Sequence, residues 1–224
     1  GRSCMARRRD SGERRTPQES RRQETSRSAW IKRPEAKTWG AVIVIVVAGM
    51  AAYANSLQGE FVFDDAPAIS MNKSIRSLWR LDKVLLPVED FDYYRPVLNL
   101  SLAICYGVGG LDVVPYHLFN LGIHLAAALT LFGLVRRTLL LCPGDHQLCQ
   151  ASTALALASS LLWMLHPLQT ESVTYVIQRC EAMYGFLGLM SLYCVLRGAA
   201  SSHAWWWYGG AVAACALGIG SKEA

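Results

Sequence analysis

Charged side chains are scarce in this chain of 224 residues, of which 17% are charged and 52% are apolar. A soluble domain averages about 25% charged residues, so this shortage argues against an ordinary soluble domain. The chain also lacks a basic face outside its first segment, because 12 of its 22 Lys and Arg lie in residues 1–38. Nucleic-acid binding needs basic side chains clustered on a folded surface, and we therefore expect no nucleic-acid partner.

Paired cysteine motifs are missing as well. The seven cysteines are scattered without CxxC or Cys/His spacing, so they indicate neither a zinc site nor a disulfide framework. We expect these cysteines to be small buried hydrophobic groups, and we predict no metal ligands among them.

Aliphatic side chains are nearly absent from residues 1–38, which are rich in Arg, Glu, Ser and Gln. Such a segment buries too little apolar surface to offset its ordering entropy, which predicts a disordered basic arm. The apolar run that follows ends in Asn55, Ser56 and Leu57, which do not form a signal-peptide cleavage site. We expect this run to stay attached as a membrane anchor.

The chain does contain several long uncharged runs. The first, residues 39–57, holds 19 residues, close to the roughly 20 that a helix needs to cross a bilayer. The sequence predicts an all-α polytopic membrane domain in residues 39–224, with about five spans at 39–57, 113–135, 151–166, 182–196 and 204–220. One or two short helices are also expected at the outer face. Residues 98–110, which are apolar but too few for a span, are predicted to form one of them.

Basic residues near the span ends predict the orientation. The arm, the pair Arg136 and Arg137, and Arg197 are all on the cytoplasmic side if the five spans alternate. The amino terminus is then cytoplasmic. Residues 58–96 (the first outer loop), 167–181 and 221–223 lie together on the periplasmic or lumenal side.

Two adjacent carboxylates, Asp64 and Asp65, stand in the first outer loop within GEFVFDDAPAI. Like charges so close raise the pKa of one of them unless a cation or a substrate hydroxyl shares the site. The pair therefore suits acid–base catalysis, although a solvated turn before Pro67 accounts for it equally well. Carboxylates also bind divalent metals, but this pair does not require one.

A polar face is predicted inside the second span. His117, Asn120 and His124 are spaced i, i+3 and i+7 and so share one side of a helix. Polar groups are costly in lipid, which directs this face into the helix bundle or a water-filled cavity. The spacing favours hydrogen bonds between helices over metal ligation.

The segment HPLQTESVTYVIQRCE carries many polar side chains between two apolar runs. Arg179 lies between Glu171 and Glu181, and a guanidinium at the bilayer edge can hold a lipid phosphate through two parallel hydrogen bonds. A solvated loop would account for the same composition. Near the other end of the chain, Lys222 and Glu223 repeat the pairing of a cation with an acid.

Four segments together carry a family resemblance. FVFDDAPAI, YRPVLNLSLAICYGVGGLDVVPYHLFNLGIHLAAALTLFGLV, HPLQTESVTYVIQR and GIGSKEA resemble the amino-terminal membrane region of the TMTC-like proteins. These are multispanning glycosyltransferases of the GT-C type with tetratricopeptide repeats behind the membrane part, and they have bacterial relatives. The resemblance covers about residues 55–224 and identifies the chain as a truncated front part of such an enzyme.

The resemblance implies transfer of a sugar, mannose in the animal members, from a polyprenyl-phosphate carrier to Ser or Thr of an exported protein. Lipid, the lipid-linked donor and the protein acceptor would be its partners, in a bacterial inner membrane or an endoplasmic reticulum. It assigns catalysis to the position of Asp64 and Asp65. The expected substrate and lipid-phosphate site comprises Arg95, His166, Glu171, Arg179, Lys222 and Glu223.

A transporter subunit or a non-catalytic membrane scaffold is the alternative. It would use His117, Asn120 and His124 as part of a pathway or of a seam between helices. Transport sites lie near the bilayer midplane between broken helices. The acids and cations of this chain gather at one predicted surface instead, which favours an enzyme acting on a membrane-bound substrate.

Overall fold

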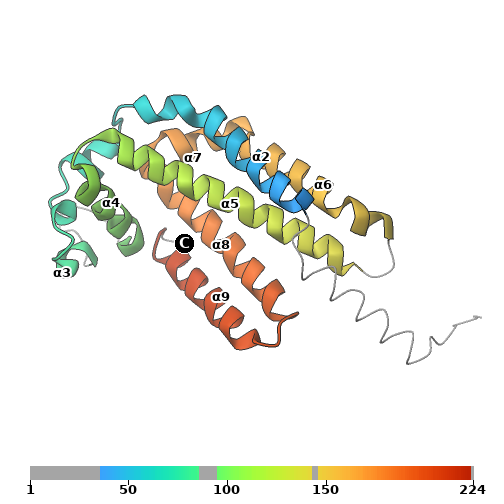
Figure 1. Cartoon of the computed structure of the whole chain (residues 1–224). Coiled ribbons are helices and arrows are strands. Elements are labelled where there is room, and N and C mark those ends of the chain that lie inside the picture. Colours follow the sequence, from blue (N-terminus) through green and yellow to red (C-terminus); the bar gives the residue numbers. More distant parts are fainter. Residues whose placement is uncertain (1–35, 86–94, 143–145, 223–224) are drawn as a thin grey trace, which may run out of the picture. The chain divides into compact units, whose positions relative to one another are not determined.

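The computed structural model describes residues 36–85, 95–142 and 146–222, all within one unit of the chain, residues 35–224 (Figure 1). The described residues form helices and contain no strand, so the predicted all-α fold is confirmed. The longer helices are α2 (Ala36–Tyr53), α4 (Pro96–Gly109), α5 (Val113–Leu141), α6 (His146–Met164), α8 (Arg179–Gly198) and α9 (Ala204–Ile219). Shorter elements are η1 (Ala54–Gln58), η2 (Ala66–Ser70), η3 (Ser74–Arg76), α3 (Leu81–Leu85), η4 (Pro167–Gln169), α7 (Thr170–Thr174) and η5 (Val176–Gln178).

Each predicted span coincides with a helix, but the number of helices suited to crossing a membrane is lower than five. Among the described residues, Ala36–Gln58 and Val113–Leu141 have the length and hydropathy of a span. A third is added if Gln147–Met164 and Pro167–Thr174, bent by 59°, form one broken span.

The physical reason lies in α8 and α9. Helix α8 includes Arg179, Glu181 and Arg197 at its two ends, which lowers its mean hydropathy. Helix α9 has only 16 residues, or about 24 Å at 1.5 Å per residue, against a hydrocarbon core of about 30 Å. The uncharged windows of the sequence revealed the apolar centres but not these charged or short ends.

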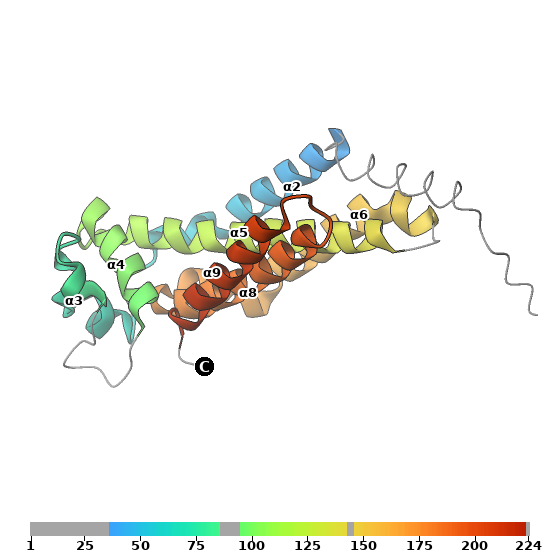
Figure 2. The ribbon, with the colours of Figure 1, turned by 90° about the horizontal axis from the view of Figure 1, so that it is seen from below.

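The five long helices α2, α5, α6, α8 and α9 run alongside one another, with α9 against α8 and α5 between α6 and α8 (Figures 1 and 2). Ala41 and Ile45 of α2 pack on Ala128 and Phe132 of α5. Gly49 of α2 permits the close approach of the two helices, because a Cβ at this position would lie 2.5 Å from a side-chain carbon of Leu125 in α5. A helix interface in a membrane depends on such small residues.

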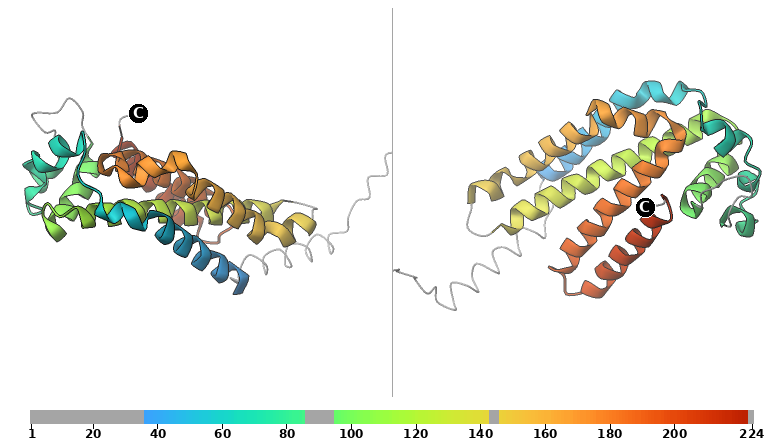
Figure 3. Two further views of the ribbon diagram at one scale, coloured as in Figure 1. Left: turned by 90° about the horizontal axis from the view of Figure 1, so that it is seen from above. Right: turned by 180° about the vertical axis from the view of Figure 1, so that it is seen from behind.

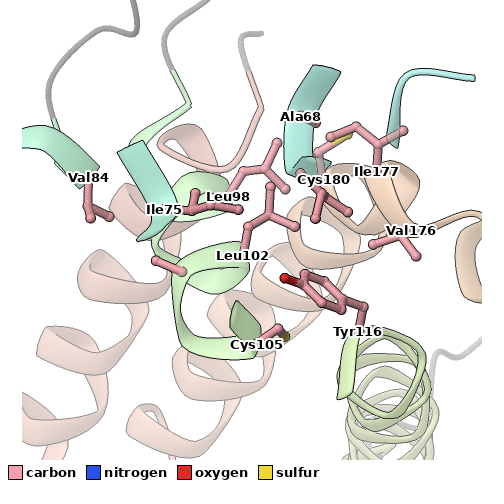
Figure 4. Packing of buried hydrophobic residues seen from close by; sticks show 12 residues of the cluster. Ala68, Ile75, Val84, Leu98, Leu102, Cys105, Tyr116, Val176, Ile177 and Cys180 are labelled. Carbon is pink, nitrogen blue, oxygen red and sulfur yellow. The ribbon is translucent and has the colours of Figure 1, made fainter. Parts of the chain in front are cut away.

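The short elements gather at the end of the bundle where α5 begins (Figure 3). Helix α4, with 14 residues, packs against η3, α3 and α5. A second cluster of buried side chains joins the segment after α2 to α4, α5 and the start of α8 (Figure 4). Its members include Ala68, Ile75, Val84, Leu98, Leu102, Cys105, Tyr116, Val176, Ile177 and Cys180.

The arginines expected on the cytoplasmic side lie at the other end of the bundle. The Arg137 guanidinium lies 6.0 Å from the ring centre of Tyr193, and that of Arg197 lies 4.5 Å from the ring centre of Trp207. The end of α5 therefore lies against the last turns of α8, and the end of α8 lies against the start of α9. Residues 1–35 of the predicted arm and 86–94 of the predicted outer loop lie outside the described residues, and α2 begins at Ala36.

A cysteine-labelling experiment tests which side of the membrane each end faces. In a full-length protein without native cysteines, Gln58→Cys and Gln169→Cys should react with a membrane-impermeant thiol reagent added from outside. Thr138→Cys, exposed near the end of α5, should react only after the membrane is opened. Labelling of the Thr138 position alone in intact cells would invert the orientation.

Candidate active site

The two adjacent aspartates face opposite ways. Asp65 is fully buried, whereas Asp64 is exposed. Residues 62–65 form a tight turn, in which the Asp65 N–H donates to the Val62 carbonyl at 2.9 Å. Phe63 within this turn has φ of 45°, a left-handed conformation that is rare for a bulky side chain.

Both carboxylate oxygens of Asp65 are used inside the protein. Oδ1 accepts a hydrogen bond from the Ile177 N–H at 2.8 Å, and Oδ2 accepts one from the Val62 N–H at 3.1 Å. Burial raises the pKa of the Asp65 carboxyl, although these hydrogen bonds oppose the rise. Asp65 thus fixes the turn to the start of the 176–178 segment rather than facing a substrate.

Asp64 offers its carboxylate to solvent. Its backbone N–H donates to the Tyr175 hydroxyl at 3.1 Å, and the Tyr175 ring lies edge-on to that of Phe63 with 6.4 Å between centres. Because Asp65 turns inward, the pair does not present two carboxylates to one cation. Within the described part of the chain, no three His, Cys, Asp or Glu side chains are grouped as metal ligands.

Arg179 is fully buried, which differs from the surface position that the sequence suggested. Its Nε donates to Asn120 Oδ1 at 2.8 Å and its Nη2 to the Tyr116 carbonyl at 2.9 Å. Nη1 lies 3.4 Å from both Ser101 Oγ and Cys105 Sγ. In this arrangement the guanidinium joins α4, α5 and α8 and has no surface on which to meet a phosphate.

The acids near Arg179 in sequence bond elsewhere. Glu171 accepts a hydrogen bond from Gln178 Nε2 at 3.3 Å, and Glu181 pairs with Lys222 at 2.6 Å. The guanidinium instead lies 4.8 Å from the ring centre of Phe119. Neutral oxygens, the Cys105 sulfur and an aromatic ring of α5 therefore surround this cation, because α8 presents it inward.

The polar face of α5 lies inside the bundle, and each of its side chains bonds to a backbone carbonyl. His117 Nε2 is 3.1 Å from the Gly59 carbonyl, and His124 Nε2 is 3.0 Å from the Met164 carbonyl. The Asn120 amide donates to the Tyr175 carbonyl at 3.3 Å. These contacts hold the loops after α2 and α6 against α5.

The cations Arg95 and Lys222 lie near each other where α4 and α8 begin and α9 ends. Lys222 Nζ is 2.6 Å from a Glu181 carboxylate oxygen, and both side chains are partly exposed. Arg95 Nη1 is 3.9 Å from the sulfur of Cys180, the neighbour of Glu181. The Glu181 hydrogen bond raises the pKa of Lys222, so this ammonium stays charged at neutral pH.

His166 and Glu171 do not join this group of cations. His166 is exposed, and its Nδ1 accepts the Leu168 N–H at 3.2 Å, which caps the short turn before α7. Glu171 is exposed in α7. Glu223 lies outside the described residues.

One short stretch, residues 175–181, connects the acidic turn to the cations. Tyr175 and Ile177 contact the turn, whereas Cys180 and Glu181 contact Arg95 and Lys222. Sequence reasoning missed the parts played by Tyr175 and Glu181 as partners. The available signal was their position in an otherwise apolar chain, within the same polar segment as Arg179.

Comparison with known proteins finds similarity to protein O-mannosyl-transferases. The chain is 29% identical over 189 residues to the protein O-mannosyl-transferase tmtc2 of Xenopus laevis, covering 75% of the chain and 21% of that protein. It is 33% identical over 160 residues to Tmtc3 of Drosophila melanogaster, covering 63% of the chain and 17% of that protein. With mouse TMTC4 it shares 30% identity over 173 residues, covering 69% of the chain and 23% of TMTC4.

No family model matches the chain, and no solved structure matches it. The chain spans about a fifth of the length of the curated relatives it matches. All three relatives carry the name protein O-mannosyl-transferase, and each similarity covers 63% or more of this chain. The chain therefore belongs to the TMTC-like family.

Proposed function

We propose that this chain forms the part of a membrane glycosyltransferase that supplies its catalytic base and a cationic site for a lipid phosphate. The whole protein transfers mannose from a polyprenyl-phosphate carrier to Ser or Thr of exported proteins. The observation that supports this proposal is the 175–181 stretch, which links the exposed Asp64 to Arg95 and Lys222. A displacement at a sugar needs a base on one side and charge stabilisation on the other.

The reaction is a single displacement with inversion at the anomeric carbon. Asp64 takes the proton of the acceptor hydroxyl as that oxygen bonds to the anomeric carbon. The bond from this carbon to the phosphate oxygen breaks, and the phosphate leaves with the electron pair. Lys222 and Arg95 stabilise the developing negative charge on that oxygen.

Asp64 rather than Asp65 is the base in this proposal. A general base must come within hydrogen-bond distance of the proton that it removes. Asp65 is buried with both oxygens occupied, while Asp64 is open to solvent. We assign Asp65 the task of holding the turn.

The outer side of the membrane is the proposed location of the reaction, periplasmic or lumenal according to the cell. The arginines Arg137 and Arg197 lie at the opposite end of the bundle, which supports this orientation through the positive-inside rule. A transporter or scaffold is less well supported. The face of His117, Asn120 and His124 is occupied by backbone hydrogen bonds, as expected for loop attachment rather than for a pathway.

The test is mannose transfer from mannosyl-phosphoryl-polyprenol to a Ser/Thr peptide by membranes that contain the full-length protein. Lys222→Gln should raise the donor KM about 10- to 100-fold, because a charge-assisted hydrogen bond contributes about 1.5–3 kcal/mol. Lys73→Gln, at an exposed lysine of the first outer loop on the same predicted side of the membrane, is the matched control and should leave the donor KM unchanged.

Two outcomes contradict different parts of the proposal. An absence of transfer by the wild-type protein would remove the proposed activity. Transfer with an unchanged donor KM in Lys222→Gln would leave Lys222 as a partly exposed partner of Glu181, an interaction worth about 0–1 kcal/mol.

A further inference from the structure

The backbone of Phe63 is unusual in a way that bears on Asp64. Among the described residues other than glycine, Phe63 alone has a positive φ, 45°, and its side chain is 86% exposed. An L-residue with a large side chain adopts this conformation only where its surroundings hold it there. Since Phe63 directly precedes Asp64, whatever holds its backbone also sets the direction of the Asp64 carboxylate.

Tyr175 contacts both of these residues. Its ring lies edge-on to the Phe63 ring at 6.4 Å and an interplanar angle of 81°. Its hydroxyl accepts the Asp64 N–H at 3.1 Å. Two consecutive residues of the strained turn are thus held by one side chain from a segment 111 positions later in the chain.

Tyr175 is itself held by the buried network around Arg179. The Tyr175 carbonyl accepts a hydrogen bond from the Asn120 amide at 3.3 Å, and Asn120 Oδ1 accepts one from Arg179 Nε at 2.8 Å. Both Asn120 and Arg179 are fully buried. A continuous series of contacts therefore runs from the guanidinium inside the bundle to the exposed aspartate.

We propose that Tyr175 is the positioning residue for Asp64: it holds the strained turn in which Asp64 faces outward while Asp65 faces inward. This inference rests on the proposed function for its kinetic consequence. Tyr175 acts through the Asp64 backbone, through the Asp64 carboxylate beside its hydroxyl and through the Phe63 ring, and it does not touch the sugar. Without its hydroxyl, the Phe63 backbone relaxes toward negative φ and the Asp64 carboxylate loses its fixed direction.

The experiment uses the full-length protein with two readouts, amide hydrogen exchange in residues 62–65 and steady-state kinetics. Tyr175→Phe keeps the ring and removes the hydroxyl. It should speed exchange of the Asp64 amide and lower kcat, each about 2- to 10-fold, the range for one neutral hydrogen bond. Both KM values should stay unchanged, because neither substrate loses a contact. Tyr184→Phe, at a 44% exposed tyrosine of α8, is the matched control and should change neither readout.

A second variant tests the role of strain. Asn adopts the left-handed conformation more readily than Phe, so in a Phe63→Asn background Tyr175→Phe should lower kcat less than it does alone. Equal losses in the two backgrounds would contradict the role of strain in this turn. They would do so even if Phe63→Asn itself reduced the activity.

The outcomes separate this inference from the proposed function. Unchanged exchange of the Asp64 amide in Tyr175→Phe overturns the positioning role, whether or not the protein transfers sugar. A raised donor KM with unchanged kcat also overturns it, because Tyr175 would then contact the donor. An inactive wild-type protein removes the proposed function alone, and the exchange measurement still decides whether Tyr175 holds the turn.

Discussion

Asp64→Asn should lower sugar transfer by the full-length protein about 10²- to 10⁴-fold, the usual contribution of a general base. The amide keeps the size of the carboxylate, but it replaces one acceptor oxygen with an NH₂ donor and cannot take up the proton of the acceptor hydroxyl. Because the Asp64 side chain is exposed and its backbone N–H provides the contact with Tyr175, the folded protein should be retained. The measurement is kcat for mannose transfer, with protein level and thermal midpoint recorded in parallel.

Asp82→Asn is the matched control for this variant. Asp82 is an exposed acid of the same predicted outer loop and forms a surface ion pair with Arg80 at 3.3 Å, so its loss should change neither kcat nor the thermal midpoint appreciably. Asp65→Asn should differ from both variants. It places an NH₂ group beside one of two backbone N–H donors and should lower the thermal midpoint. Full activity of Asp64→Asn would remove this residue as the base.

The helices were predictable because a run of about 20 uncharged, mostly apolar residues is typical of a membrane-spanning helix. The runs at 39–57 and 113–135 became parts of α2 with η1 and of α5, and the short apolar run at 98–110 became α4. The ends were less predictable. Arg179 joins α8 rather than a loop because partners on α4 and α5 satisfy its guanidinium inside the bundle, and local hydropathy carries no information about partners so far away in sequence.

The candidate site was likewise predictable only in part. Sequence could identify Asp64 and Asp65 as adjacent acids, but not that Asp65 is buried, because its partner Ile177 lies far away in the sequence. It could mark Lys222 as a cation beside an acid, but its structural partner is Glu181, far away in the sequence. Such pairings arise from the packing of α8 on α9, which a single sequence does not specify.

The second large expected effect is the loss of stability when Arg179 is substituted. Arg179→Lys and Arg179→Gln should each lower the free energy of unfolding by about 1–3 kcal/mol, because each substitution leaves the buried Asn120 Oδ1 without its guanidinium donor and an unsatisfied buried polar group costs about 1–3 kcal/mol. Lysine does not rescue the site, because a single ammonium cannot reproduce the fork that reaches Asn120, Tyr116 and Ser101.

The comparison with Arg80→Lys and Arg80→Gln separates a buried structural cation from a phosphate ligand. Arg80 is 58% exposed in its side chain and pairs with the equally exposed Asp82, so both changes should shift the thermal midpoint little. For Arg179 the thermal midpoint of the purified full-length protein should fall with either substitution, and the surviving folded fraction should keep the parental donor KM. Suppose instead that Arg179→Gln kept the thermal midpoint and raised the donor KM. The guanidinium of the unaltered protein would then have to leave its buried contacts to meet the lipid phosphate. The anchoring of Tyr175 through Asn120 and Arg179 would lose its basis.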